Sequence, residues 1–134
     1  MANTFCVANE TELIAALDDA EDNGADDVIK IQIKQDPYYG NFVYASTESF
    51  GVTIEGGYTA LCASRVVDPT NTILDGGGAG RVLTLNSEEA PTFVVEGITL
   101  QYGYARKGGG ISIENSSLTI RNCKLMTLSL KTRH

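Results

Sequence analysis

Short apolar segments, each closed by one charged or polar residue and a Gly or Asn, recur through the middle of the chain. Four copies can be aligned on the charged residue, and they occupy residues 52–57, 72–77, 94–98 and 118–123. The charged residue recurs at intervals of 20 to 25 residues, which is typical of proteins built from stacked repeats. Each copy is too short to bury its own apolar side chains, so neighbouring copies must stack. The pattern predicts an all-β solenoid, in which each repeat is one coil of a parallel β-helix.

Ahead of the repeats, the pattern predicts a strand and then a helix. Phe5 and Val7 alternate with smaller residues, as in a short strand. Three aliphatic residues then share one helical face: Leu13, Ile14 and Leu17. Thr11 can cap this helix, which we expect to span residues 11–22. Its apolar face can cover the first open end of the β-helix, so we interpret it as a capping helix.

The chain length favours one domain of 134 residues. We expect the strand and capping helix within residues 4–24, the coils within 28–125, and a tail over 126–134. The tail alternates like a strand but has no corner or cap after it, so the solenoid is expected to be truncated at its C-terminal end. Such an open end can pair with another chain. We therefore predict a homo-oligomer formed through the open C-terminal end.

Composition and charge limit the partners. The formal net charge is −7 with an isoelectric point near 4.5, which argues against nucleic acid or an anionic lipid surface. Cations, neutral sugars and proteins remain. We expect no membrane span, because no apolar run approaches the roughly 20 residues that a transmembrane helix requires. The first residues lack the basic and apolar segments of a secretion signal, so the protein is either cytosolic or has lost its signal.

The charged residues of the repeats form the first candidate site. In a regular stack, Glu55, Asp75, Glu96 and Arg121 would lie on successive coils about 4.8 Å apart. Three carboxylates at that spacing repel one another, and a bound Ca²⁺ would relieve the repulsion. A sugar site is the second interpretation. The structural alternative is that water screens the carboxylates and Arg121 neutralises one end of the row.

Tyrosines form the second candidate site. Tyr38 and Tyr39 occupy one predicted corner, and Tyr102 and Tyr104 another. Exposed rings in a shallow groove can bind carbohydrate, because they combine an apolar plane with a polar edge. The alternative is that these tyrosines pack on neighbouring coils.

Catalytic and metal-binding motifs are not recognisable. The chain has neither a nucleophile motif nor a phosphate-binding loop, and its one histidine, His134, is the last residue. Three cysteines, Cys6, Cys62 and Cys123, fit no metal-ligand spacing. They are either small buried residues or one disulfide with a thiol left over.

Several segments together resemble a known family. They are Phe5-Cys6-Val7, residues 11–17, Asp26-Asp27-Val28-Ile29, Tyr39-Gly40, Ile54-Glu55-Gly56-Gly57-Tyr58, residues 68–78 and Gly108-Gly109-Gly110-Ile111. In these segments the chain resembles the N-terminal part of bacterial right-handed parallel β-helix repeat proteins with the pectin-lyase-like fold. The resemblance covers residues 5–125. It is informative about fold rather than activity, because such proteins include polysaccharide lyases, hydrolases, esterases, adhesins and surface proteins.

The resemblance implies an exported protein that is secreted, periplasmic or on the cell surface, although no signal is present in this chain. It also implies that Cys6 pairs with Cys62, leaving Cys123 as the odd thiol. Family members are usually longer, so we interpret the chain as a non-catalytic fragment with a role in adhesion, assembly or carbohydrate binding. The first alternative is the N-terminal part of a polysaccharide lyase or hydrolase whose catalytic coils are missing, and the second is a truncated product without activity.

Overall fold

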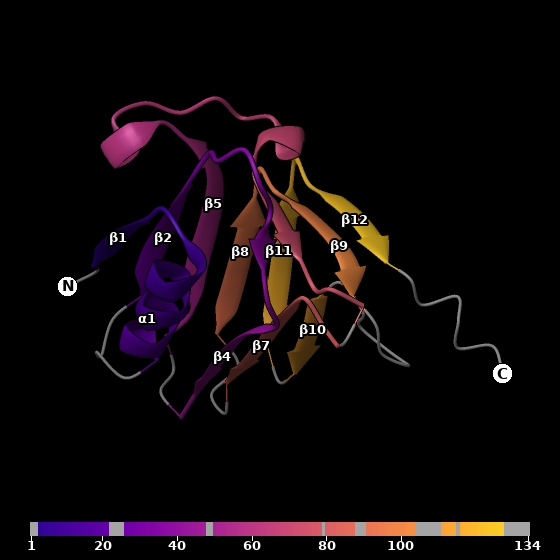
Figure 1. Cartoon of the computed structure of the whole chain (residues 1–134). Coiled ribbons are helices and arrows are strands. Elements are labelled where there is room, and N and C mark those ends of the chain that lie inside the picture. The colour runs from indigo at the N-terminus through magenta and orange to yellow at the C-terminus, as the bar shows by residue number, and fades with distance from the viewer. Residues whose placement is uncertain are drawn as a thin grey trace, which may run out of the picture.

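The structure is a computed structural model of the whole chain. It describes residues 3–21, 26–47, 50–78, 80–87, 91–103, 111–114 and 116–127. Within these residues, the chain forms three β-sheets whose neighbouring strands are all parallel, together with one α-helix at the N-terminal end (Figure 1).

The three sheets are called A, B and C. Sheet A contains β1 (Thr4–Val7), β2 (Asp27–Gln32), β5 (Val52–Tyr58), β8 (Thr92–Glu96) and β11 (Ser117–Arg121), in that spatial order. Sheet B contains β3 (Tyr38–Tyr39), β6 (Ile73–Asp75), β9 (Thr99–Gly103) and β12 (Lys124–Thr127). Sheet C contains β4 (Phe42–Ser46), β7 (Leu83–Ser87) and β10 (Ile111–Glu114).

From β2 onward, the chain enters the sheets in one repeated order: A, then B, then C. Each strand therefore pairs with the strand three places later along the chain. The loop between β5 and β6 is the longest described connection, and it contains two short 3₁₀ helices, η1 (Ala60–Cys62) and η2 (Pro69–Asn71). The repeated order brings residues far apart in sequence into fixed rows across each sheet.

The core consists of rows of apolar side chains that continue from strand to strand. In sheet A one row contains Ile29, Ile54, Val95 and Ile120. In sheet B one row contains Tyr38, Leu74, Leu100 and Leu125. The members of each row are buried except in the last strand, where Ile120 is 40% and Leu125 49% exposed. The core is therefore closed toward β1 and open toward β11 and β12.

One of the four sequence repeats is assigned to the wrong position. The copies at residues 52–57, 94–98 and 118–123 contribute to sheet A, whereas the copy at 72–77 contributes β6 to sheet B. An aliphatic segment followed by an acidic residue and glycine can precede either corner, so the local pattern does not identify the sheet. Leu74 consequently lies in the row of Tyr38 and Leu100 rather than with Ile54.

The helix predicted near the N-terminus is present as α1 (Glu10–Ala20), with two differences. Asn9 rather than Thr11 caps it, because the Asn9 side chain accepts a hydrogen bond from the Glu12 N–H (2.9 Å). Ile14 is half exposed and does not belong to the packing face. That face consists of Leu13, Ala16, Leu17 and Ala20. Two small alanines allow close contact with β1, β2 and β4.

Both ends of α1 also bind the outer strands of sheets B and C. The Glu10 carboxylate accepts a hydrogen bond from the Tyr39 N–H in β3 (3.0 Å). The Glu21 carboxylate accepts one from the Ala45 N–H in β4 (2.9 Å). Among the residues that the structure describes, β3 and β4 are the outer strands of their sheets, with a neighbouring strand on one side only. The helix therefore covers apolar surface and also satisfies edge backbone groups, as expected for a cap.

Candidate functional site

The outer face of sheet A carries a row of four charged residues at paired positions: Lys30, Glu55, Glu96 and Arg121. The row includes Glu55, Glu96 and Arg121, as predicted, but Asp75 is not part of it. Asp75 lies in sheet B at the position paired with Tyr39 and Gln101. The expected cluster of three carboxylates is therefore reduced to two, because the 72–77 repeat belongs to another sheet.

Arg65, from the loop between β5 and β6, lies against these two carboxylates. Its Nη1 is 3.4 Å from Glu96 Oε1 and 3.9 Å from Glu55 Oε2. Its Nε donates a hydrogen bond to the Gly56 carbonyl (2.9 Å). All three charged side chains are only about one-fifth exposed. A guanidinium from this loop thus compensates the carboxylates. The repeat pattern predicts this role for Arg121, which is instead exposed on β11.

Tyr58 completes the cluster beside Glu55. Its hydroxyl donates to Glu55 Oε1 (2.6 Å), and Lys30 Nζ and Arg65 Cζ each lie 5.2 Å from the ring centroid. Burial, and then the hydrogen bond to the Glu55 carboxylate, raise the pKa of Tyr58 to about 12. Two cations, one ring and two carboxylates thus satisfy one another and hold the loop on sheet A. Across the described ranges, no set of three or more His, Cys, Asp or Glu side chains is arranged to bind a metal.

Asp75 has a structural environment of its own. One carboxylate oxygen accepts from the Gly77 N–H (2.8 Å), and the other accepts from the Gln101 side chain (2.9 Å). The residue is only 5% exposed. Asp75 therefore fixes the glycine corner after β6 to the neighbouring strand β9.

The four candidate tyrosines separate into three groups. Tyr38 is fully buried, and its hydroxyl donates to the Gln32 carbonyl (2.7 Å), so its prediction as a sugar contact is wrong. Burial raises the pKa of Tyr38 well above its usual value. Tyr39 and Tyr102 are 55% and 47% exposed on strands of sheet B. Tyr104 lies outside the described residues. Only Tyr39 and Tyr102 present rings to a ligand within the described part of the chain.

The cysteines form one disulfide and one free thiol. Cys6 in β1 is bonded to Cys62 in η1, with the two Cα atoms 6.1 Å apart. This is the pairing that the family resemblance implied, and it fixes the long loop to the first strand of sheet A. The free thiol of Cys123 packs against the core, and burial raises its pKa. Cys123 is therefore less reactive than an exposed thiol.

A shallow groove of about 410 Å³ crosses the outer face of sheet A next to Gly51. Asp26, Gly51 and Thr92, which lie at the starts of three neighbouring strands, are among the residues that line it. An added Cβ at Gly51 would lie 2.2 Å from the Thr92 carbonyl oxygen, so the strands approach closely there. The Asp26 carboxylate accepts from the Gly51 N–H (2.8 Å) and so stabilises the same approach. These contacts hold the starts of β2, β5 and β8 close together beside the groove.

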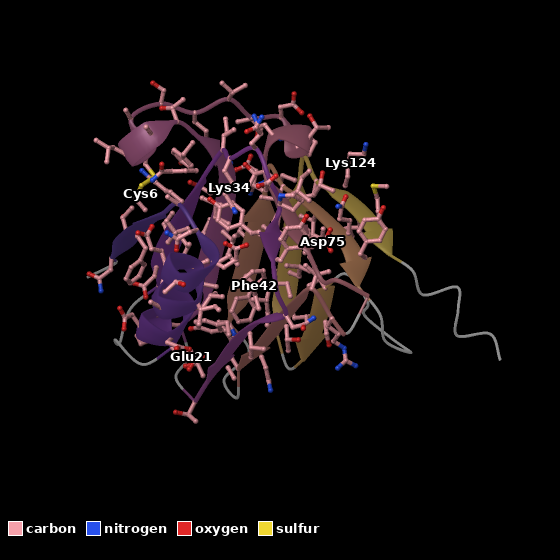
Figure 2. All side chains as sticks on the ribbon, viewed as in Figure 1. Cys6, Glu21, Lys34, Phe42, Asp75 and Lys124 are labelled. Atoms are coloured by element: carbon pink, nitrogen blue, oxygen red, sulfur yellow. A yellow bond between two sulfur atoms is a disulfide. The ribbon has the colours of Figure 1, made fainter. Side chains whose placement is uncertain are left out.

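The strands β10, β11 and β12 form the last strand of sheets C, A and B, respectively, and all three lie at the same end of the molecule (Figure 1). We call them the C-terminal edge. Three large apolar side chains are exposed on it: Ile120 (40%), Leu125 (49%) and Met126 (50%). Figure 2 shows Lys124, on this edge, on the side of the molecule opposite to Cys6. Among the described residues each of these strands has a neighbour on one side only. Exposed apolar side chains on such edge strands are typical of an interaction surface.

Comparison of this chain with models of known protein families, with curated proteins and with solved structures gives no match.

The described residues include no helix of the length and apolarity that crossing a membrane would require.

Proposed function

We propose that sheets A, B and C are the three faces of one right-handed parallel β-helix of the pectin-lyase-like kind. The repeated A, B, C order supports this proposal, because one passage through the three sheets corresponds to one coil. The continuous apolar rows support it as well, since stacked coils align equivalent side chains. The N-terminal coil is then sealed by α1, and β10, β11 and β12 belong to the coil farthest from α1 among the described residues.

This β-helix is a non-catalytic assembly module of an exported or cell-surface protein. The observation that carries the proposal is the difference between the two ends: α1 covers one, whereas at the C-terminal edge the described strands pair on one side only and expose apolar side chains. The charged cluster around Arg65 supports a structural role, because its members bind one another. The Cys6 to Cys62 disulfide supports export, because such bonds persist in oxidising compartments.

Sedimentation velocity at increasing protein concentration tests this function. We expect the wild-type protein to self-associate at micromolar concentration and Leu125→Lys to shift it to the monomer, because a charge replaces apolar contact area. Ile14→Lys is the matched control, since Ile14 is equally exposed (50% against 49%) but lies on α1. A wild-type protein that stays monomeric, or equal effects of the two substitutions, would contradict the proposal.

Carbohydrate binding is the second candidate function, and the exposed rings of Tyr39 and Tyr102 in sheet B favour it. Binding of neutral oligosaccharides can be measured by calorimetry on the wild type, Tyr39→Ala and Tyr102→Ala. Loss of binding in both variants supports a sugar surface, and no heat with the wild type argues against it. Release of unsaturated uronates from pectin or alginate would instead support the enzyme alternative.

A further inference from the structure

We propose that residues 59–64, at the start of the loop between β5 and β6, are a redox-controlled arm. The Cys6 to Cys62 disulfide holds this arm against β1 and β2, and reduction by a dithiol releases it while the three sheets stay folded. The inference concerns a conformational change within one molecule, so it does not depend on the proposed assembly function. Three properties of the arm support it: its attachment, its backbone conformation and the accessibility of its disulfide.

The attachment of the arm to sheet A depends on Cys62. The backbone hydrogen bonds of the arm stay inside it: the Cys62 N–H donates to the Thr59 carbonyl (2.8 Å), and the Thr59 N–H donates to the Ser64 carbonyl (2.9 Å). Within the described part of the chain, the one further polar contact between the arm and a sheet is that of Cys62 Sγ with the Lys30 carbonyl oxygen (3.8 Å). Breaking the disulfide therefore removes the single covalent attachment of the arm.

The base of the arm is held by other contacts. The Val66 N–H donates to the Gly57 carbonyl (2.8 Å). The Arg65 guanidinium binds the Glu96 carboxylate and the Gly56 carbonyl. These contacts involve no cysteine, so a reductant does not affect them directly. The arm can therefore leave β1 while Arg65 and the residues after it keep their positions.

The backbone of the closed arm is unfavourable at two consecutive residues. Leu61 and Cys62 have φ values of +59° and +55°, in the left-handed region that residues with a side chain disfavour. Leu61 is 87% exposed, so packing of its side chain does not offset this cost. The surrounding structure must maintain such a conformation. Because Cys62 is the attached residue, the arm should relax once Cys62 is no longer bonded to Cys6.

The disulfide is accessible to a small reductant, because Cys6 is exposed and Cys62 is partly exposed. The Gln32 amide donates a hydrogen bond to Cys6 Sγ (3.2 Å), which stabilises a thiolate on that atom. A thiolate of the dithiol attacks Cys62 Sγ, the S–S bond breaks, and Cys6 leaves as a thiolate. The second thiol of the reagent then displaces Cys62. Two electrons and two protons pass from the dithiol to the cysteines, and the reagent becomes a cyclic disulfide.

Amide hydrogen exchange in dithiothreitol tests the release. We expect reduction of the wild type to speed exchange of the Cys62 and Ala63 amides about tenfold, with β5 and β8 unchanged, and reoxidation to reverse the effect. Cys62→Ser without reductant should expose the Ala63 amide to the same extent as reduction does. Cys123→Ala is the matched control, because it removes the thiol outside the disulfide, and it should behave like the wild type.

Two results would overturn the proposal. Unchanged exchange in the arm after reduction would show that the disulfide does not hold it. Unfolding of the sheets on reduction would show that the disulfide stabilises the whole fold rather than the arm. Sedimentation does not enter this test, so a failure here leaves the proposed assembly function as it is.

A substitution at Leu61 tests the backbone contribution. Asn tolerates the left-handed region better than Leu, so Leu61→Asn should favour the closed arm. We expect the ratio of reduced to oxidised dithiothreitol at half reduction to rise about threefold. Ala63→Asn is the matched control, because Ala63 is exposed in the same turn but has a φ of −72°. No rise in Leu61→Asn, or an equal rise in both variants, would overturn the role of the left-handed turn in the release.

Discussion

Glu55 and Glu96 occupy paired positions on neighbouring parallel strands, where two negative charges repel one another. Arg65 offsets this repulsion because its guanidinium contacts both carboxylates. The same side chain donates a hydrogen bond to the Gly56 carbonyl through Nε. The effect of the charge can be tested separately from the effect of the planar donors, because a lysine at position 65 keeps the positive charge and loses the planar set of donors.

We expect Arg65→Met to lower the free energy of unfolding by about 2 kcal/mol, because two partly buried carboxylates lose their cation and a carbonyl loses its donor. Arg65→Lys should lose less, since the charge remains. Urea unfolding followed by circular dichroism measures both variants. Adding Glu96→Gln to Arg65→Met should recover part of the loss. If it recovers nothing, the repulsion between the carboxylates is not what Arg65 offsets.

Two glycines should respond differently to the same substitution. A Cβ at Gly56 would lie 2.5 Å from the Gly97 carbonyl oxygen, so a strand must move. A Cβ at Gly77 would meet no atom within 4 Å, but the φ of Gly77 is +67°, a left-handed backbone conformation that strains residues with a side chain. We expect Gly56→Ala to lose about 3 kcal/mol and Gly77→Ala about 1 kcal/mol of unfolding free energy. Thermal and urea unfolding distinguish them, and equal losses would show that space does not matter at Gly56.

At the scale of secondary-structure elements, α1 is attached to sheet B through Glu10. The Tyr39 N–H is the main reason that the pKa of Glu10 lies below its usual value, and partial burial opposes it. The Nζ of Lys34 lies 3.4 Å from Glu10 Oε1 and lowers the pKa of Glu10 further. A carboxyl group with a lowered pKa in the folded protein stabilises the fold above its unfolded-state pKa and loses this contribution on protonation.

Glu10→Gln therefore tests how the helix end is held. We expect the wild type to be the more stable protein at neutral pH, and the difference to shrink as the pH falls below about 4.5. The measurement is urea unfolding at a series of pH values. Asp18→Asn serves as the control, because Asp18 is exposed on the same helix. A constant difference between wild type and Glu10→Gln at every pH would show that the Glu10 charge does not stabilise this contact.

The sequence predicts whether a segment is a strand or a helix better than it predicts which strands pair with one another. Alternation indicated the strands, and helical spacing indicated α1, because both patterns are local. The sheet to which β6 belongs depends on the path of the long loop before it, which has no local sequence signal. The sequence therefore places Asp75 in the row of Glu55 and Glu96, whereas it lies in sheet B. Arg65 has no periodic position in the sequence, and only the folded loop brings it to Glu55 and Glu96. Neighbouring residues of a strand face opposite sides, so one of the two tyrosines of β3 must be buried. Because β3 has only two residues, no alternation indicates that it is Tyr38 rather than Tyr39.

At the scale of the whole molecule, the two ends of the sheets differ in how their edge strands are covered. On the N-terminal side, the outer strands of sheets B and C donate hydrogen bonds to α1 and Glu21. On the C-terminal side, the described strands give β11 one neighbour, β8, and give β12 one neighbour, β9. In stacked architectures each unit is stabilised mainly by its immediate neighbours. Stability should therefore decrease from β5 and β8 toward the C-terminal edge.

Amide hydrogen exchange measures this gradient directly. At low protein concentration we expect the slowest exchange in β5 and β8, slow exchange at Tyr39 and Ala45, and the fastest strand exchange in β10, β11 and β12. The reason is that amides on the unpaired side of an edge strand exchange without local unfolding. Raising the concentration should slow exchange in β11 and β12 selectively, because a second molecule then supplies the missing acceptors. Uniform protection across the three sheets at low concentration would contradict the gradient, and concentration-independent exchange in β11 would contradict pairing at this edge.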